Sequence, residues 1–275
     1  MTIELGKYGV WRYYKLFTPD AAAELERLGY GALWLGGSPE SELPVVEDLL
    51  AATETLKVGT SIVNIWTAPA AEVAESFHRI ERRFPGRFVL GIGAGHPESN
   101  APYRSPYEAL VEYLDELDEA KVPVSGRMLA ALGPKVLKLA ADRTAGALPY
   151  LTTPEHTAQA REIVGDALLV PEQKLVVDTD PESARATGRG VVEMYLGLRN
   201  YTTNLRRLGY TDEDLAKPGS DRLLDALAVH GSAEQVATQA RAHIEAGADH
   251  LALQALGDDY LAALRALAPL LIARS

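Results

Sequence analysis

The chain has 275 residues, of which 47 % are hydrophobic and 24 % charged, a profile typical of a globular protein with a substantial core. Its 27 basic and 38 acidic residues leave a net charge of −11, which argues against binding to a nucleic-acid backbone or an anionic membrane surface, since both attract Lys and Arg. The chain has no cysteine, which excludes disulfides, thiolate nucleophiles and thiolate metal sites.

The N-terminal stretch MTIELGKYGVWRYYKL lacks the uninterrupted apolar core of a secretory signal, and no run has the length of a membrane-spanning helix. The six histidines are scattered along the chain and do not form a metal-binding motif. We therefore expect a cytoplasmic protein with a small-molecule substrate and without metal, nucleic-acid or membrane partners. The sequence leaves a homodimer open.

Short apolar runs alternate with segments of helical period along the chain. Eight runs are expected as strands, at residues 8–13, 32–37, 57–66, 87–96, 127–133, 146–153, 174–179 and 250–256. A helical segment is expected after each strand. The stretch 181–247, between the seventh and eighth strands, is expected to be mostly helical with a break around 217–219.

Strands separated by helices form βαβ units and hence a parallel sheet. The runs are apolar throughout rather than alternating, which is typical of a sheet covered on both faces. Eight such units in 275 residues predict an α/β fold, a (β/α)8 TIM barrel forming a single domain over residues 1–275. An open doubly wound sheet is the alternative, because the chain pattern does not show closure.

In a TIM barrel, functional residues gather at the C-terminal ends of the strands. Here those ends carry aromatic, amide and hydroxyl side chains rather than carboxylates. The sequence contains no acid pair for glycoside hydrolysis, no zinc-binding helix motif and no serine nucleophile motif. A polar, mostly uncharged and glycine-lined rim suits a large planar cofactor lying against the backbone.

Three glycines follow one another at alternate positions in the fourth predicted strand, RFVLGIGAGH. The dinucleotide-binding pattern G-x-G-x-x-G has its third glycine one residue later, so the run does not match it. We interpret Gly91 and Gly93 as allowing close packing inside the barrel. Gly95 is interpreted as letting the backbone approach a cofactor.

Two long segments, VGTSIVNIWTAPAAEVAESFHRIERRFPGRFVLGIGAGHPE and ALGPKVLKLAADRTAGALPYLTT, resemble the bacterial luciferase-like oxidoreductases. The resemblance is strongest to the branch that uses the deazaflavin coenzyme F420, and it extends over nearly the whole chain. It rests on G-T-S in the third strand, G-x-G-x-G in the fourth and G-P-K after the fifth. It implies a TIM barrel with a flavin-like ring at its mouth, with F420 as the expected cofactor and FMN as the alternative.

The resemblance also implies which residues contact that cofactor. A bulge with a non-proline cis peptide behind the ring would fall at Ser61 and Ile62, with Asn64 near the ring. The expected contacts from the fourth strand and the later loops are Gly93, Ala94, Gly95, His96, Leu132, Gly133, Pro134, Lys135, Thr152 and Thr153. The segment 132–135 opens a helix, whose free N–H groups favour the cofactor phosphate. The basic residues best placed to offset the acidic tail of F420 are Lys135, Lys138 and Arg104.

His96 is the candidate catalytic residue, as a general acid or a substrate anchor, and a loop residue without function is the alternative. Four aromatic residues near strand ends are candidates for the walls of a substrate pocket, with packing at the rim as the alternative: Trp11, Tyr13, Trp34 and Trp66. Trp66 is the strongest of them because it follows the expected bulge.

The chain departs from the family pattern in two places. Several F420 enzymes carry an acidic residue and a histidine at the end of the second strand, where this chain has Leu35-Gly36-Gly37. The insertion that covers the site is expected to be shortened to the loop 97–106.

The sequence leaves three functions open. The first is an F420-dependent oxidoreductase that moves a hydride between the deazaflavin and a small organic substrate. The second is an FMN-dependent luciferase-like monooxygenase, and the third is a flavin-binding protein without turnover. A cofactor of this kind performs the redox chemistry itself, which explains why no acid–base pair stands out.

Overall fold

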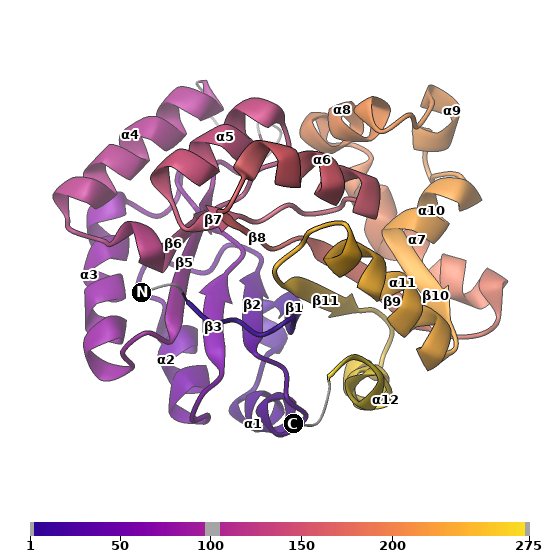
Figure 1. Cartoon of the computed structure of the whole chain (residues 1–275), viewed down its shortest axis with the longest axis horizontal. Helices are drawn as coiled ribbons and strands as arrows, with labels where there is room; N and C mark the ends of the chain where they lie inside the picture. Colours follow the sequence, from indigo (N-terminus) through magenta and orange to yellow (C-terminus); the bar gives the residue numbers. More distant parts are fainter. Residues whose placement is uncertain (1–2, 97–104, 273–275) are drawn as a thin grey trace.

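The computed structural model describes residues 3–96 and 105–272 (Figure 1). The strands are β1 (Tyr8–Tyr13), β2 (Ala32–Gly36), β3 (Lys57–Thr60), β4 (Val63–Asn64), β5 (Phe88–Gly93), β6 (Arg127–Leu129), β7 (Gly146–Ala147), β8 (Leu168–Leu169), β9 (Glu172–Val177), β10 (Ala228–Gly231) and β11 (Leu251–Ala255). The α-helices are α1 (Pro19–Arg27), α2 (Pro44–Ala51), α3 (Ala70–Arg83), α4 (Pro106–Glu119), α5 (Pro134–Arg143), α6 (Pro154–Val164), α7 (Pro181–Tyr195), α8 (Arg199–Arg207), α9 (Asp212–Leu215), α10 (Asp221–Leu227), α11 (Ala233–Glu245) and α12 (Tyr260–Leu271).

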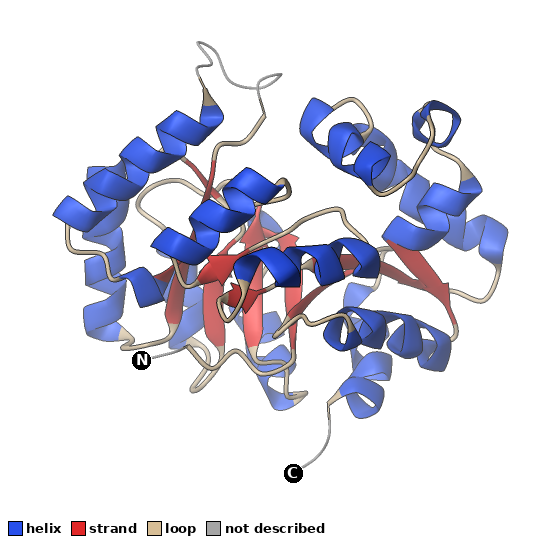
Figure 2. Cartoon of the chain, turned by 45° about the horizontal axis from the view of Figure 1, so that its top comes forward, coloured by secondary structure: helices blue, strands red, loops and turns tan. Residues whose placement is uncertain are grey.

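The strands form one curled parallel sheet with helices packed around it (Figure 2). Its strand order is β10-β9-β11-β1-β2-β3-β5-β6-β7-β8, and β4 also pairs with β5. Only Val170 and Pro171 separate β8 from β9. This short segment joins the two sides of the sheet, because Val170 N donates to Ala147 O at 3.0 Å and Ala252 N donates to Pro171 O at 2.9 Å. The fold is therefore of the TIM-barrel type predicted from the sequence, and not an open doubly wound sheet.

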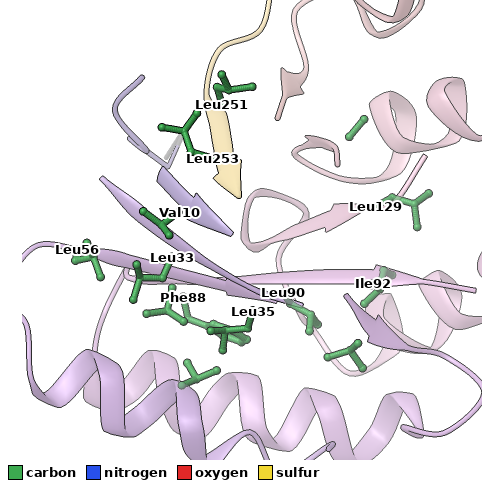
Figure 3. Packing of buried hydrophobic residues seen from close by; sticks show 14 of the residues in the cluster. Val10, Leu33, Leu35, Leu56, Phe88, Leu90, Ile92, Leu129, Leu251 and Leu253 are labelled. Carbon is green, nitrogen blue, oxygen red and sulfur yellow. The ribbon is translucent and has the colours of Figure 1, made fainter. Parts of the chain in front are cut away.

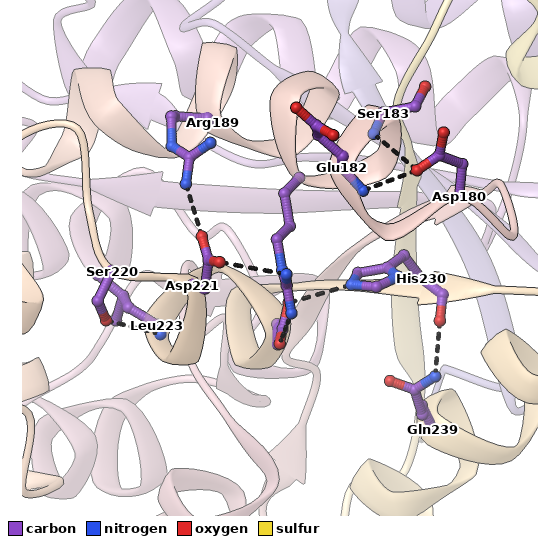
Figure 4. A network of polar contacts seen from close by, with 11 residues as sticks. Asp180, Glu182, Ser183, Arg189, Ser220, Asp221, Leu223, His230 and Gln239 are labelled. Atoms are coloured by element: carbon purple, nitrogen blue, oxygen red, sulfur yellow. Dashed lines mark hydrogen bonds and ion pairs between the residues drawn. The ribbon is translucent and has the colours of Figure 1, made fainter.

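The stretch 181–247 contains the helices α7 to α11, but also β10, which the sequence analysis missed. β10 has four residues and leads almost directly into α11, so its apolar content does not stand out from the helical pattern. It pairs with β9 from Ala228 opposite Lys174 to Gly231 opposite Val177. Polar contacts hold β10 to its neighbours: Gln239 Nε2 of α11 donates to His230 O at 3.0 Å (Figure 4), and His230 Nε2 is hydrogen-bonded to Asp225 Oδ1 of α10 at 3.0 Å.

Side chains alternate between the two faces of each strand. The outward residues form the larger core, between the sheet and the helices; Figure 3 labels Val10, Leu33, Leu35, Leu56, Phe88, Leu90, Ile92, Leu129, Leu251 and Leu253. The inward residues form a second, smaller core inside the barrel, which includes Trp11, Trp34, Val89, Met128 and Leu148.

Glycines make room for the two tryptophans inside the barrel. A Cβ on Gly36 would lie 2.0 Å from the Trp11 ring, and a Cβ on Gly59 would lie 2.4 Å from the Trp34 ring. Gly91 is equally constrained, because a Cβ there would lie 1.9 Å from the carbonyl oxygen of Thr60. Close packing therefore explains Gly91, in agreement with the sequence-based interpretation. None of the described helices is long and apolar enough to cross a membrane.

Candidate functional site

The peptide bond between Ser61 and Ile62 is cis, as predicted from the resemblance. It interrupts the third strand, between β3 and β4. Trp11 of β1 reaches it, because the indole Nε1 donates to Ser61 Oγ at 3.0 Å. Ile62 lies against β5, where a Cβ on Gly93 would come within 2.9 Å of Ile62 Cγ1. Three neighbouring strands thus converge on this bulge.

The end of the fourth strand is tied to the bulge by Trp66 and Asn64. The Nε1 of Trp66 donates to Ala94 O at 2.5 Å, and Asn64 Oδ1 accepts from the backbone N–H of Trp66 at 3.1 Å. Asn64 also pairs with Gly93 in the sheet. Gly95 has a φ of +57°, a left-handed conformation that residues with a side chain rarely adopt.

Three tyrosines gather across the barrel mouth, and we call Tyr150, Tyr195 and Tyr201 the tyrosine cluster. The Tyr150 ring is 5.1 Å from the Trp11 ring and 5.3 Å from the Tyr195 ring. Tyr195 meets Tyr201 edge-on at 5.2 Å. Tyr150 comes from the end of the sixth predicted strand, Tyr195 is the last residue of α7, and Tyr201 lies in α8. The helices α7 and α8, which lie between the seventh and eighth predicted strands, therefore help to build the mouth.

His96 also contacts this cluster. Its ring is 5.3 Å from Tyr201, and its Nδ1 is hydrogen-bonded to Asn200 Oδ1 at 3.1 Å. The structure therefore brings the candidate catalytic histidine to the mouth, where α8 holds it.

A buried ion pair lies beside the tyrosine cluster, inside the barrel. Lys174 Nζ is 2.9 Å from Glu172 Oε2, and the side chains are 0 % and 3 % exposed. Glu172 Oε2 also accepts from the N–H of Leu151, while Oε1 has no hydrogen-bond partner among the described residues. Burial lowers the pKa of Lys174 and raises the pKa of Glu172, and the charge of each residue opposes the shift of the other.

Sequence analysis missed this pair, because Lys174 was placed at the edge of a predicted strand. A signal was present: Glu172 and Lys174 are two residues apart in the strand EQKLVV, and such a spacing puts opposite charges on one face of a strand.

A second part of the site lies at the start of α5, where a phosphate was expected. Gly133 caps α5 without a side-chain hydrogen bond, and Pro134 and Lys135 form its first turn. The Nζ of Lys135 sits 3.7 Å from the centre of the Tyr107 ring. Arg207 of α8 lies closest to Gly133: its Nη1 atom is 3.2 Å from the position that a Cβ on Gly133 would occupy. Arg207 was not foreseen, because it is far away in the sequence.

Two buried polar atoms near the starts of α5 and α6 have no hydrogen-bond partner within the described part of the chain: Thr152 Oγ1 and His156 Nδ1. The other ring nitrogen of His156 is hydrogen-bonded to Leu132 O at 2.8 Å. Thr153 caps α6 and lies on a groove of about 460 Å³ beside Tyr210. Burial lowers the pKa of His156, so this histidine is neutral at pH 7.

Trp34 and Tyr13, two of the candidates for the walls of a substrate pocket, lie in different parts of the barrel. Trp34 has no exposed surface, and its Nε1 donates to His250 Nε2 at 3.0 Å, so it packs in the barrel interior and cannot wall an accessible pocket. Tyr13 is 41 % exposed, and its ring covers Gly37, where a Cβ would lie 2.2 Å away. Gly36 and Gly37 are thus covered by Trp11 and Tyr13, at the place where several F420 enzymes carry polar residues.

The other two expected basic residues are Lys138 and Arg104. Lys138 forms an ion pair with Asp142, one turn further along α5. Arg104 lies outside the described residues, as does most of the loop 97–106. In the described segments, no three His, Cys, Asp or Glu side chains gather in a way that could hold a metal ion.

The fold and this mouth define the class: a TIM-barrel protein with a polar, aromatic site at the ends of its strands. Residues 17–127 match the family of luciferase-like monooxygenases. A 5,10-methylenetetrahydromethanopterin reductase of Archaeoglobus fulgidus is 24 % identical over 245 residues, which cover 68 % of this chain and 73 % of the reductase.

Solved structures share the fold over nearly the whole chain. An F420-dependent secondary alcohol dehydrogenase, solved with an F420-acetone adduct, superimposes with a TM-score of 0.75 at 15 % identity and covers 98 % of both chains. The oxygenating constituent of 3,6-diketocamphane monooxygenase from Pseudomonas putida, solved with FMN, has a TM-score of 0.65 at 14 % identity and covers 96 % of this chain and 97 % of its own. The solved structures show the shared fold, and the family match over residues 17–127 confirms the resemblance to the luciferase-like oxidoreductases in that part of the chain.

Proposed function

We propose that the protein is an F420-dependent oxidoreductase that moves a hydride between the deazaflavin and a small organic substrate. The observation that carries the proposal is the bulge between β3 and β4 at the barrel mouth, where Trp11 donates to Ser61 and a Cβ on Gly93 would lie 2.9 Å from Ile62. It lies where the resemblance puts the back of the flavin-like ring, and Gly93 leaves the neighbouring strand without a side chain. The F420-dependent proteins among the relatives support the choice of F420 over FMN.

The residues present fit such a cofactor. Trp11, Ile62 and Gly93 offer a flat surface for a ring, and the start of α5 offers N–H groups and the cations Lys135 and Arg207 for a phosphate. Thr152 Oγ1 and His156 Nδ1, which have no hydrogen-bond partner among residues 3–96 and 105–272, are polar atoms that a ligand would satisfy. When bound, F420 supplies the hydride chemistry, while the chain binds, orients the substrate and excludes water.

F420 should bind more tightly than FMN, and its affinity should fall as salt screens its acidic tail. Arg207→Ala should weaken F420 binding by about 10-fold, because a hydrogen bond between charged groups is lost. Arg206→Ala is the matched control, since the Arg206 side chain is already bonded to Asp212 at 2.9 Å. Fluorescence titration of the purified protein at low and high salt measures these affinities. Equal or tighter binding of FMN would favour the FMN-dependent monooxygenase instead.

Gly95→Leu should abolish detectable F420 binding while leaving the protein folded. A leucine at this left-handed position projects toward the proposed cofactor and lowers the stability by about 1–2 kcal/mol. Gly86→Leu provides the control, because Gly86 has a φ of +67° with nothing within 4 Å of a Cβ. Both variants should unfold slightly earlier in urea, and only Gly95→Leu should lose the cofactor. Unchanged F420 affinity in Gly95→Leu would contradict the assignment of this residue.

A further inference from the structure

We propose that Tyr150 is a catalytic residue whose hydroxyl holds the substrate oxygen and gives it a proton, and that the buried Lys174–Glu172 pair is a positioning pair beside it. The inference rests on the proposed function for its chemistry. The assignment of Tyr150, Lys174 and Glu172, however, rests on their observed contacts alone.

The Tyr150 ring is anchored next to the cis peptide. It packs on Trp11 at 5.1 Å, and Trp11 in turn donates its indole N–H to Ser61. Tyr150 is only half-buried at the mouth. Two contacts therefore connect this ring to the place proposed for the cofactor ring.

The Tyr150 hydroxyl can donate a proton, and the neighbouring Tyr195 hydroxyl can replace that proton. It donates to Gln254 Oε1 at 3.1 Å and lies 2.9 Å from the Tyr195 hydroxyl. With its proton directed to Gln254, the Tyr150 oxygen accepts from Tyr195, which is also half-buried at the mouth. Burial holds the pKa of Tyr150 well above its ordinary value, so the hydroxyl is a protonated donor at neutral pH.

Lys174 acts on Tyr150 through its ring. The Nζ atom lies 3.9 Å from the centre of the Tyr150 ring and 5.4 Å from that of Tyr195. A cation against the ring face favours negative charge that develops on the ring oxygen or on a substrate oxygen bonded to it. Glu172 fixes the position of this cation through their 2.9 Å contact.

Stability alone does not explain the pair. Removing two charges from water is costly, and apolar residues of similar volume are often at least as stable in such a place. An ion pair beside a polar hydroxyl at the barrel mouth is better explained by a role in the chemistry.

The proposed step is balanced for a carbonyl substrate. A bound reduced deazaflavin would supply the hydride that forms the new C–H bond at the carbonyl carbon. The electron pair of the C=O π bond moves to the oxygen, which takes the proton of Tyr150. Tyr150 regains a proton from Tyr195, and Tyr195 regains one from water. Oxidation of the alcohol is the reverse of each step.

A binding test uses 4-nitrophenol, an uncharged aromatic hydroxyl compound whose ionised form carries an oxyanion and absorbs differently. The wild-type protein should bind the ionised form, and Tyr150→Phe should weaken that binding by about 10- to 100-fold, because the donor to the oxyanion is lost. Tyr210→Phe is the matched control, a half-buried tyrosine that packs on Arg222 outside the mouth. Failure of the wild type to bind the probe, or equal binding by Tyr150→Phe, would overturn the proposal.

A kinetic test measures hydride transfer from reduced F420 to benzaldehyde in a single turnover. Tyr150→Phe should lower the rate by about 100-fold with unchanged F420 affinity, as for the loss of one oxyanion donor. The double variant Glu172→Leu/Lys174→Met should lower it by about 10-fold, a loss that a purely structural pair would not produce. A loss confined to His96→Ala, with Tyr150→Phe active, would overturn the proposal. If F420 does not bind or benzaldehyde is not reduced, the kinetic result counts against the proposed function, and the 4-nitrophenol test decides on Tyr150.

Discussion

Lys174→Met should lower the free energy of unfolding by about 3–5 kcal/mol at pH 7. The substitution keeps most of the side-chain volume but leaves Glu172 as a buried carboxylate without its cation. Glu172 Oε1 already has no partner among the described residues, so the carboxylate has little other compensation. Urea unfolding followed by circular dichroism measures the loss. The loss should shrink at lower pH, because Glu172 then takes up a proton and its charge disappears.

Two further variants separate this effect from a general effect of removing a lysine. Glu172→Leu/Lys174→Met removes both charges and should lie within about 1 kcal/mol of the wild type, or above it. Lys138→Met, which breaks an exposed ion pair with Asp142, should change the stability by less than about 1 kcal/mol. A double variant as unstable as Lys174→Met would show that packing, and not the uncompensated charge, causes the loss.

The protein should lose stability as the pH falls from about 6.5 to about 4, because two histidines are buried in the neutral form. Burial lowers the pKa of His243 and that of His250 to about 4. An unfolded histidine has a pKa of about 6.5, so between these values the unfolded chain binds protons that the folded chain does not. Stability therefore rises with pH in this window, and each histidine contributes about 3 kcal/mol to the change.

Burial is the main cause of both low pKa values, and hydrogen bonds hold each buried ring in place. His250 Nε2 accepts from Trp34 Nε1 at 3.0 Å, while its Nδ1 is bonded to Gly6 O, so a second ring proton would oppose the indole N–H. His243 is held between Thr157 Oγ1 and Gln173 Oε1, both at 2.8 Å.

Urea unfolding between pH 7 and pH 4.5 tests this prediction. His243→Gln and His250→Gln should each make the pH dependence shallower by up to one proton, and the double variant should keep only the contribution of groups such as His156, whose pKa burial also lowers. Asp214 does not interfere, because its pKa of about 2 moves its own contribution to lower pH. The contribution of Asp214 is present above about pH 4 and lost as the pH falls toward 2. A double variant as steep as the wild type would contradict the assignment to these histidines.

The sequence by itself predicted the TIM-barrel fold and most of its strands. Long apolar runs followed by helical segments are a local pattern, and a parallel sheet covered on both faces requires that pattern whatever else the chain does. It also predicted a site at the strand ends, and its explanation of Gly91 by close packing is confirmed. The cis peptide at Ser61 and Ile62 was predicted by resemblance to a family and not by local propensity.

Only the tertiary structure decided which side chains meet. The inward direction of Glu172 and Lys174 depends on the register of β9 between β10 and β11, and β10 was not foreseen. Arg207 lies beside Gly133, and the Tyr201 ring packs on the His96 ring. Both contacts arise because α8, which is far from these residues in the sequence, lies at the barrel mouth.

The burial of Trp34 has the same kind of cause, since the curl of the sheet brings Gly59 and His250 against its ring. The sequence pattern determined the elements and their order, because these follow from local hydrophobic periodicity. The contacts between side chains far apart in the sequence depend on register and curvature, which no local pattern contains.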